Sequence, residues 1–136
     1  CRPVGGLDTS IVVEMYCRTP SAELLQHEWQ AHGACGWKSP RAYFAQAAKL
    51  YDRVRMPRIE AIPPAALTAG AVRAAFIARN PWLSRDQIYV QTTKAEELSE
   101  IRLCYDVRFR PAACPGGAGA ADRVHIRLAP SRSGAF

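Results

Sequence analysis

Apolar residues recur at the spacing of one helical face in the first half of the chain, most clearly over residues 39–55. Ser39 offers a cap for this helix, and Pro40 suits its first turn. The apolar stripe comprises Tyr43, Phe44, Ala47, Leu50, Tyr51 and Val54. A shorter apolar pattern over residues 11–16 follows the capping triplet at 8–10 and predicts another helix.

A third helix is predicted from Ser21 to about His32. Thr19 is expected to cap it, with Pro20 in the first helical position. Gly33 stands where a helix commonly ends in the left-handed conformation. The sequence therefore predicts a regular helix that stops at Gly33.

The second half of the chain begins with a proline-rich connection and one more helix. Residues 56–66 carry three prolines and read as a loop. Thr68 is expected to cap a helix that runs to about Arg79, where the Asn-Pro pair at 80–81 ends it.

Beyond that helix the apolar period changes to two, which is typical of half-buried strands. Strands are predicted over residues 88–93 and 101–107, and residues 115–121 form a Gly/Ala-rich loop. A third strand is expected where Val124, Ile126 and Leu128 face one way. Helices precede antiparallel strands, so we expect an α+β fold, with an antiparallel sheet packed against several helices in a single domain over 1–136.

Composition supports a folded, basic protein. The chain has 136 residues, of which 49% are hydrophobic, and a formal charge of +6. Fifteen of its eighteen cationic residues are Arg, whose fork of donors suits phosphate. A polyanionic partner fits this balance, and so does an ordinary basic surface. No apolar run approaches the roughly 18 residues of a membrane helix, so no membrane partner is expected.

Five cysteines in so short a chain favour an oxidising compartment, either secreted or periplasmic. They form no CxxC pair and no Cys/His cluster with zinc spacing, so no structural metal is expected. The chain begins with Cys1 and has no signal-like segment. We therefore expect a processed product or a piece of a longer protein.

Two of the three histidines fall within one predicted helix, in the segment His27-Glu28-Trp29-Gln30-Ala31-His32-Gly33. The zinc-protease motif H-E-x-x-H needs histidines four residues apart so that both share a face. His27 and His32 are five apart, which in an α-helix separates them by roughly 140°. Ala31 occupies the position of the second ligand. The spacing thus argues against a metal hydrolase and predicts no metal site.

Glu28 and His32 are four residues apart and should stack on one helical face. A carboxylate beside an imidazole can transfer protons near neutral or mildly acidic pH. His27, at the edge of that face, can hold an anion. The alternative is an ordinary surface helix with a local Glu–His pair.

The run LLQHEWQAHGAC resembles the second active-site segment of the ribonuclease T2 family, usually H-E-W-x-K-H-G-T-C. The segments RTPSAELLQHEW, SPRAYFAQAAKLYDRV, LTAGAVRAAFIARNPWL and LSEIRLCYD are similar to other parts of that family, in the same order. The resemblance implies a ribonuclease T2-like fold whose N-terminal part is missing here. It also implies a secreted or periplasmic endoribonuclease that uses no metal or other cofactor.

The resemblance further implies a reaction and roles for its residues. Such enzymes cleave single-stranded RNA, but not DNA, by attack of the ribose 2′-hydroxyl on phosphorus, leaving a 2′,3′-cyclic phosphate. His32 would be an acid/base residue, Glu28 would stabilise the phosphate, and His27 would bind it. Trp29 is expected to pack the helix onto the sheet. Arg18 and Ser21 lie in a loop that contacts a second base in some relatives.

Two departures from the family pattern matter. Ala31 replaces a Lys, which predicts weakened activity. The family's first catalytic His belongs to an H-G-L-W-P segment that would precede Cys1, so we expect this chain alone to have little or no activity. The remaining histidine, His125, reads as a solvated strand residue. The alternative function is a catalytically impaired relative that binds RNA or a protein partner.

The resemblance also implies a pattern of disulfides. Cys1 would pair with Cys35, and Cys104 with Cys114. Cys17 would then be the odd cysteine, either a free thiol or bonded to a segment outside this chain.

Overall fold

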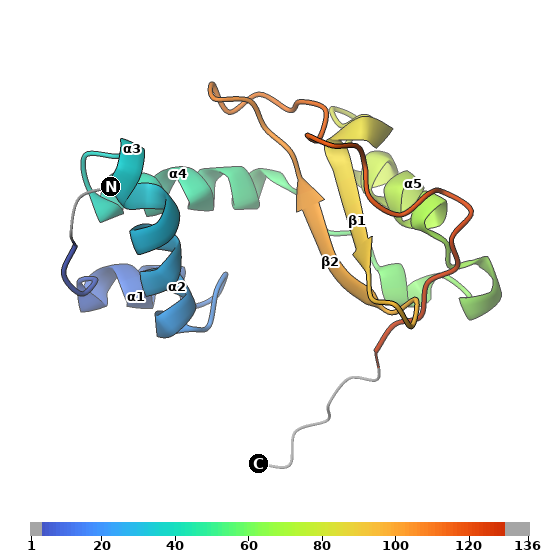
Figure 1. Ribbon diagram of the computed structural model, residues 1–136, viewed down its shortest axis with the longest axis horizontal. Coiled ribbons are helices and arrows are strands. Elements are labelled where there is room, and N and C mark those ends of the chain that lie inside the picture. The colour runs from blue at the N-terminus through green and yellow to red at the C-terminus, as the bar shows by residue number, and fades with distance from the viewer. Residues whose placement is uncertain (1–3, 130–136) are drawn as a thin grey trace, which may run out of the picture. The chain divides into compact units, whose positions relative to one another are not determined.

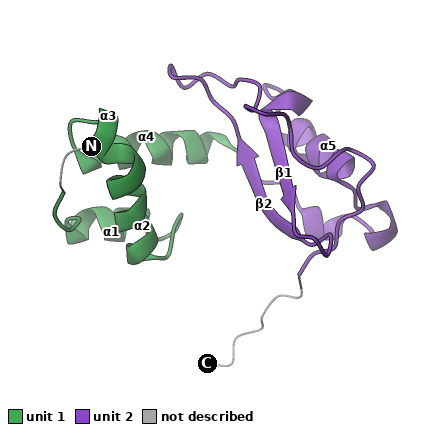
Figure 2. Ribbon diagram, viewed as in Figure 1, with its two compact units in different colours: residues 1–54 green, residues 55–136 purple. Residues whose placement is uncertain are grey.

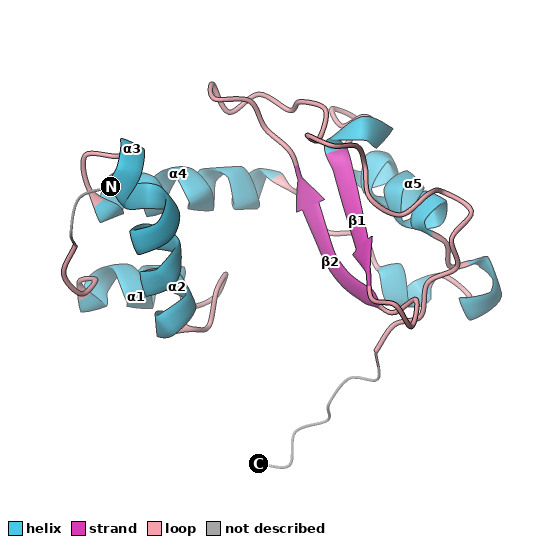
Figure 3. Cartoon of the chain, in the orientation of Figure 1, coloured by secondary structure: helices cyan, strands magenta, loops and turns pink. Residues whose placement is uncertain are grey.

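The computed structural model describes residues 4–129 and contains both helices and a small antiparallel sheet (Figure 3). The residues group into two compact units, Cys1–Val54 and Arg55–Phe136 (Figure 2). The single domain over 1–136 stays a prediction. Each unit has its own buried side chains. Within the described residues, no helix combines the length and the apolarity needed to cross a bilayer.

The first unit is helical, and two of its helices begin as the capping residues predict. Helix α1 spans Thr9–Met15 and is capped by the Asp8 carboxylate, which accepts the Ser10 N–H at 2.7 Å. Helix α4 spans Pro40–Arg53 and is capped by the Ser39 hydroxyl. In both cases a short polar side chain satisfies a backbone donor that the first turn leaves open.

The predicted helix over residues 21–32 is correct in place but wrong at both ends. Helix α2 spans Ala22–Glu28, and its cap is Ser21 rather than Thr19. The chain then widens into η1, a π-helical segment over Trp29–Gly33, and continues as α3, Ala34–Gly36. Gly33 has an ordinary helical φ of −69°, so it does not end the helix in the left-handed conformation.

The core of the first unit forms where α1, α2, η1 and α4 meet (Figure 1). Its buried members are Ile11, Met15, Leu25, Trp29, Ala34 and Phe44. Trp29 is buried as predicted, and it packs among the helices of its own unit, beside Tyr43. Burial of the indole fixes the backbone of η1 against the rest of the unit.

The second unit begins with two short 3-10 turns, Ile59–Ala61 and Pro64–Ala66, in the predicted proline-rich loop. Helix α5 spans Ala69–Arg79 with Thr68 as its cap, as predicted. Asn80 ends the helix as a fully buried side chain that exchanges hydrogen bonds with the backbone of Arg55.

A 3-10 turn, Arg85–Gln87, leads into the sheet, which pairs β1 (Ile88–Thr92) antiparallel to β2 (Leu98–Leu103). Helix α5 lies against β1 (Figure 1). These elements make the fold mixed α and β, with helices and an antiparallel sheet.

The second strand differs from the prediction over residues 101–107, because it starts at Leu98 and stops at Leu103. Asp106 closes a turn beyond the strand, since its carboxylate accepts the N–H groups of Arg108 and Arg110. Val107 therefore stands at a turn tip, 94% exposed, although the alternation placed it on the buried face.

The expected third strand is reduced to single bridges. His125 pairs with Thr68 and Arg127 with Glu97, while Ile126 alone is deeply buried. The backbone of Val124 and Ile126 forms hydrogen bonds with residues 67 and 69, at the start of α5. The backbone of Arg127 forms hydrogen bonds with residues 96 and 98, where β1 turns into β2. Because its partners belong to two different elements, the segment forms no continuous ladder.

The Gly/Ala-rich segment at 115–121 is a loop, as predicted, but it is held to β1. Val90 donates its N–H to the Ala118 carbonyl at 3.0 Å and accepts the Ala120 N–H at 2.9 Å. Between them Gly119 has a φ of +78°, and a Cβ there would collide with the Val90 carbonyl. Only glycine fits this close approach of two backbones.

Candidate functional site

The helix widens into a π turn at η1, and this turn brings together three side chains that could contact one ligand. The Ala34 N–H bonds to the Trp29 carbonyl, the five-residue hydrogen bond that defines a π turn. His27, Glu28 and His32 then offer ligand atoms that all lie within 4.8 Å of one another. Two of the three residues are exposed and Glu28 is half-buried, so the cluster faces solvent.

The prediction that the two histidines point in different directions is wrong. The rings of His27 and His32 meet edge to face, with centroids 6.2 Å apart. The predicted separation assumed the 3.6-residue turn of an α-helix. A π turn takes up more residues, so side chains five apart come to lie on the same side.

The predicted pair of Glu28 and His32 is present. The Nε2 atom of His32 lies 4.0 Å from Oε2 of Glu28. At this distance the two atoms form no direct hydrogen bond, and they attract each other as an ion pair only when the imidazole is protonated. Their side chains are 39% exposed for Glu28 and 61% for His32, so a substrate or ion in solvent can reach both.

The site rests on tight packing beneath η1. A Cβ on Gly33 would collide with the indole of Trp29 and lie 3.0 Å from Cγ of Tyr43. Trp37 and Phe44 add edge-to-face contacts to Tyr43, at centroid distances of 5.8 and 5.0 Å. Contacts of this kind stabilise aromatic clusters beyond their burial alone.

The negative charge of Glu28 also acts on this aromatic layer. Partial burial raises the pKa of Tyr43 above its ordinary value, and the charge of Glu28 raises this pKa further. Both effects disfavour the ionised phenolate beneath the site. The ionisable groups at its surface are two imidazoles and one carboxylate, a set that can move protons, hold an anion or bind a cation.

The two residues predicted to contact a base have partners within the first unit. Arg18 forms two hydrogen bonds to the Asp52 carboxylate, at 2.9 and 2.6 Å. The Arg18 guanidinium lowers the pKa of Asp52 below its ordinary value. Ser21 uses its hydroxyl as the cap of α2, accepting the Leu24 N–H at 3.1 Å. A role for either residue in binding a base stays a prediction.

Ala31 and His125, two further residues that bear on the predicted chemistry, are both exposed. Ala31 is exposed within η1, one residue before His32, so a longer side chain would fit there. His125 is exposed in the second unit, in its bridge with Thr68.

One predicted disulfide is confirmed. Cys104 and Cys114 are bonded, with Cα atoms 5.2 Å apart, and close a loop of sequence separation 10. Cys17 is an exposed free thiol. The predicted pairing of Cys1 with Cys35 involves a residue outside the described part of the chain.

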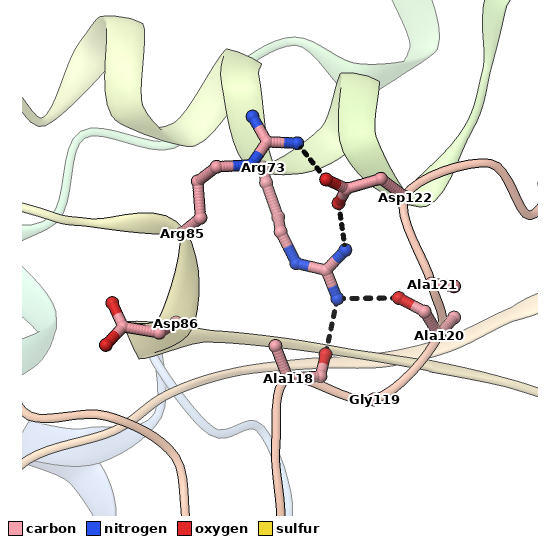
Figure 4. Close-up of a pocket in the computed structure, with 8 residues that line it drawn as sticks. All are labelled: Arg73, Arg85, Asp86, Ala118, Gly119, Ala120, Ala121 and Asp122. Carbon is pink, nitrogen blue, oxygen red and sulfur yellow. Dashed lines mark hydrogen bonds and ion pairs between the residues drawn. The ribbon is translucent and has the colours of Figure 1, made fainter.

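Sequence reasoning missed a buried arginine in the second unit (Figure 4). Arg73 is 3% exposed and donates to the carbonyls of Ile88, Ala118 and Ala120 and to the carboxylate of Asp122. Arg85 contacts the other oxygen of Asp122. The two arginines, Asp86 and the glycine-rich loop line a surface pocket. Because Arg73 is bonded to protein groups, we interpret the contacts among Arg73, Arg85 and Asp122 as a structural clamp that holds the Gly/Ala-rich loop in place.

Comparison with known proteins shows a similarity to a ribonuclease-named protein. The chain is 24% identical over 108 residues to a protein of Haemophilus influenzae named "Probable ribonuclease". The alignment covers 79% of this chain and 35% of that protein, so the chain spans about a third of the relative's length. No family model matches the chain. No solved structure matches it either.

Proposed function

We propose that the protein is a metal-independent endoribonuclease of the ribonuclease T2 type, and that His27, Glu28 and His32 belong to its active site. The observation that carries the proposal is the cluster of these three side chains, with ligand atoms within 4.8 Å on a solvent-facing surface. The similarity to a protein named as a probable ribonuclease supports the same reaction class. We also propose that the chain has the ribonuclease T2 fold.

In the proposed reaction the ribose 2′-hydroxyl attacks phosphorus, the 5′-oxygen leaves, and a 2′,3′-cyclic phosphate forms. His32 transfers a proton to or from a ribose oxygen, and Glu28 lies close enough to orient that imidazole. His27 contacts a phosphate oxygen and offsets charge that develops at phosphorus. Single-stranded RNA is the substrate, because DNA lacks the internal nucleophile. The confirmed disulfide fits a secreted or periplasmic location.

The experiment measures cleavage of single-stranded RNA and of DNA of the same sequence by the full-length protein. His32→Ala should lose at least about a thousandfold in rate, and Glu28→Gln should lose less. His125→Ala is the matched control, because this histidine is exposed and lies in the other unit. Normal cleavage by the His32 variant would refute the assigned role.

Ala31 favours a second candidate function. The residue stands where the ribonuclease T2 family usually has Lys, so the chain lacks one cation beside the phosphate. A catalytically impaired protein would bind RNA or a protein partner without cleaving RNA. Binding of single-stranded RNA that leaves the strand intact, unchanged by His32→Ala, would favour this alternative.

A further inference from the structure

We propose that the turn over residues 106–110, in the second unit, binds single-stranded RNA. In this contact Arg108 pairs with a phosphate and the ring of Phe109 stacks on a base. We call these five residues the basic turn. RNA as the ligand rests on the proposed function, whereas the surface itself is argued from the second unit alone.

Positive charge is concentrated in the second unit. Residues 55–136 carry twelve Lys and Arg against seven Asp and Glu, whereas residues 1–54 carry six against five. The second unit therefore holds most of the formal charge of +6. Pairing of cations with phosphates dominates the affinity of proteins for nucleic acids. A polyanionic strand is thus expected to bind mainly to the second unit, although the candidate active site lies in the first.

Among the cations of this unit, Arg108 combines exposure with an open guanidinium. Five other arginines of the unit pair with a carboxylate: Arg58, Arg73, Arg85, Arg102 and Arg110. Within residues 4–129, the Arg108 side chain has no such partner. A guanidinium that no carboxylate neutralises is available to a phosphate, for which its fork of donors is well shaped.

The neighbours of Arg108 supply the second half of a nucleotide contact. Val107 is 94% exposed and Phe109 is 39% exposed, so an aliphatic and an aromatic side chain flank the cation at the surface. Single-stranded nucleic acids bind where cations meet the backbone and aromatic rings meet the bases. The basic turn presents both kinds of group within three consecutive residues.

The basic turn is held in one shape before any ligand binds. The Asp106 carboxylate accepts the backbone N–H groups of Arg108 and Arg110, at 2.8 and 3.0 Å, and the Arg110 guanidinium lies 2.7 Å from the same carboxylate. The bond between Cys104 and Cys114 closes the base of the segment, beyond the end of β2 (Figure 1). A preorganised surface loses less conformational freedom when it binds.

The basic turn suits a nucleic acid better than an anionic lipid surface. Val107 is one small aliphatic side chain, and stable membrane anchoring takes a larger apolar face or an acyl chain. The partly covered ring of Phe109 offers a flat contact to a base but little area for insertion into a bilayer.

Fluorescence anisotropy of the full chain with a labelled 2′-O-methyl oligonucleotide tests the basic turn, because this single strand has no free 2′-hydroxyl and is not cleaved. Arg108→Gln should weaken binding about threefold at low salt. It should also reduce the slope of log affinity against log salt by about 0.7, the value for one phosphate contact. Phe109→Leu should weaken binding at least about fivefold and leave that slope unchanged.

Arg79→Gln is the matched control, because it removes the same charge from an exposed position at the end of α5 and should leave the salt slope unchanged. Thermal unfolding of each variant confirms that the second unit stays folded. Wild-type affinity and slope for Arg108→Gln, or equal losses for Arg108→Gln and Arg79→Gln, would overturn the proposal. Tighter binding to vesicles of phosphatidylcholine and phosphatidylglycerol than to the oligonucleotide, lost in Val107→Ser, would assign the turn to a lipid surface instead.

A cleavage assay separates this proposal from the proposed function. With long single-stranded RNA as substrate, Arg108→Gln should raise KM and leave kcat unchanged, since the side chain contributes binding and no proton transfer. A fall in kcat without a change in KM would contradict the binding role. Absence of cleavage by the wild type would refute the proposed function, while the anisotropy titration still decides the basic turn.

Discussion

The indole ring of Trp29 fills the space into which a Cβ on Gly33 would project. The two residues are the first and last of η1, so their contact spans the π turn. Widening the helix here brings His27 and His32 together, five residues apart. The buried contact between Trp29 and Gly33 thus determines how close the exposed rings of His27 and His32 lie.

Gly33→Ala should destabilise the first unit and separate the two histidines. The added methyl group meets Trp29 and Tyr43, and overpacking of this kind costs about 1–3 kcal/mol in unfolding free energy. Chemical denaturation measures the loss. Gly36→Ala is the matched control, because nothing lies within 4 Å of its added Cβ and it should change stability by less than about 0.5 kcal/mol. Equal stability of the two variants would contradict the packing argument.

Ala31→Lys should raise the rate of RNA cleavage by the full-length protein. The exposed position lies beside His32, and a cation there can stabilise developing negative charge. One such donor is worth about a hundredfold in rate, so a gain of about tenfold or more is expected. Gln30→Lys adds the same charge at the neighbouring exposed position and should have little effect. Equal effects of the two lysines would show that only net charge matters.

Arg73→Met should destabilise the second unit although the replacement is apolar. The buried guanidinium donates to three backbone carbonyls and one carboxylate, and its loss removes all of these hydrogen bonds. We expect a cost of about 2–4 kcal/mol, measured by denaturant unfolding. Arg79→Met, at an exposed position at the end of the same helix, serves as the control. A loss below about 0.5 kcal/mol for Arg73→Met would refute the clamp.

The same clamp predicts loss of stability in acid. Arg85 and then Arg73 lower the pKa of Asp122 below its ordinary value. A carboxylate with a lowered pKa in the folded state stabilises above its unfolded pKa, and this stabilisation disappears as pH falls through the folded pKa. The difference in unfolding free energy between wild type and Asp122→Asn should therefore hold constant near neutral pH and shrink below about pH 4. A difference that does not change with pH would contradict this linkage.

Local signals predicted where α4 and α5 begin, whereas features that depend on tertiary contacts could not be predicted from the sequence. Ser39 and Thr68 cap their helices because a cap needs only its own first turn. The resemblance to a family, not spacing, predicted the bond between Cys104 and Cys114.

The π turn and the burial of Arg73 could not be read from local pattern. The first depends on how Trp29 packs against Gly33, and the second on Asp122, 49 residues away in the chain. The sequence predicted the residues of the candidate site one by one. It predicted that His27 and His32 point apart because the π turn that brings them together depends on tertiary packing.

The most direct test of the central claim follows the three histidines by NMR. The protein is titrated with a dinucleotide whose 2′-hydroxyl is replaced by hydrogen, so that it binds without being cleaved. The imidazole signals of His27 and His32 should shift together, with one apparent dissociation constant, while His125 should stay unchanged. An unperturbed His32, or His27 and His32 responding with different dissociation constants, would contradict a shared phosphate site.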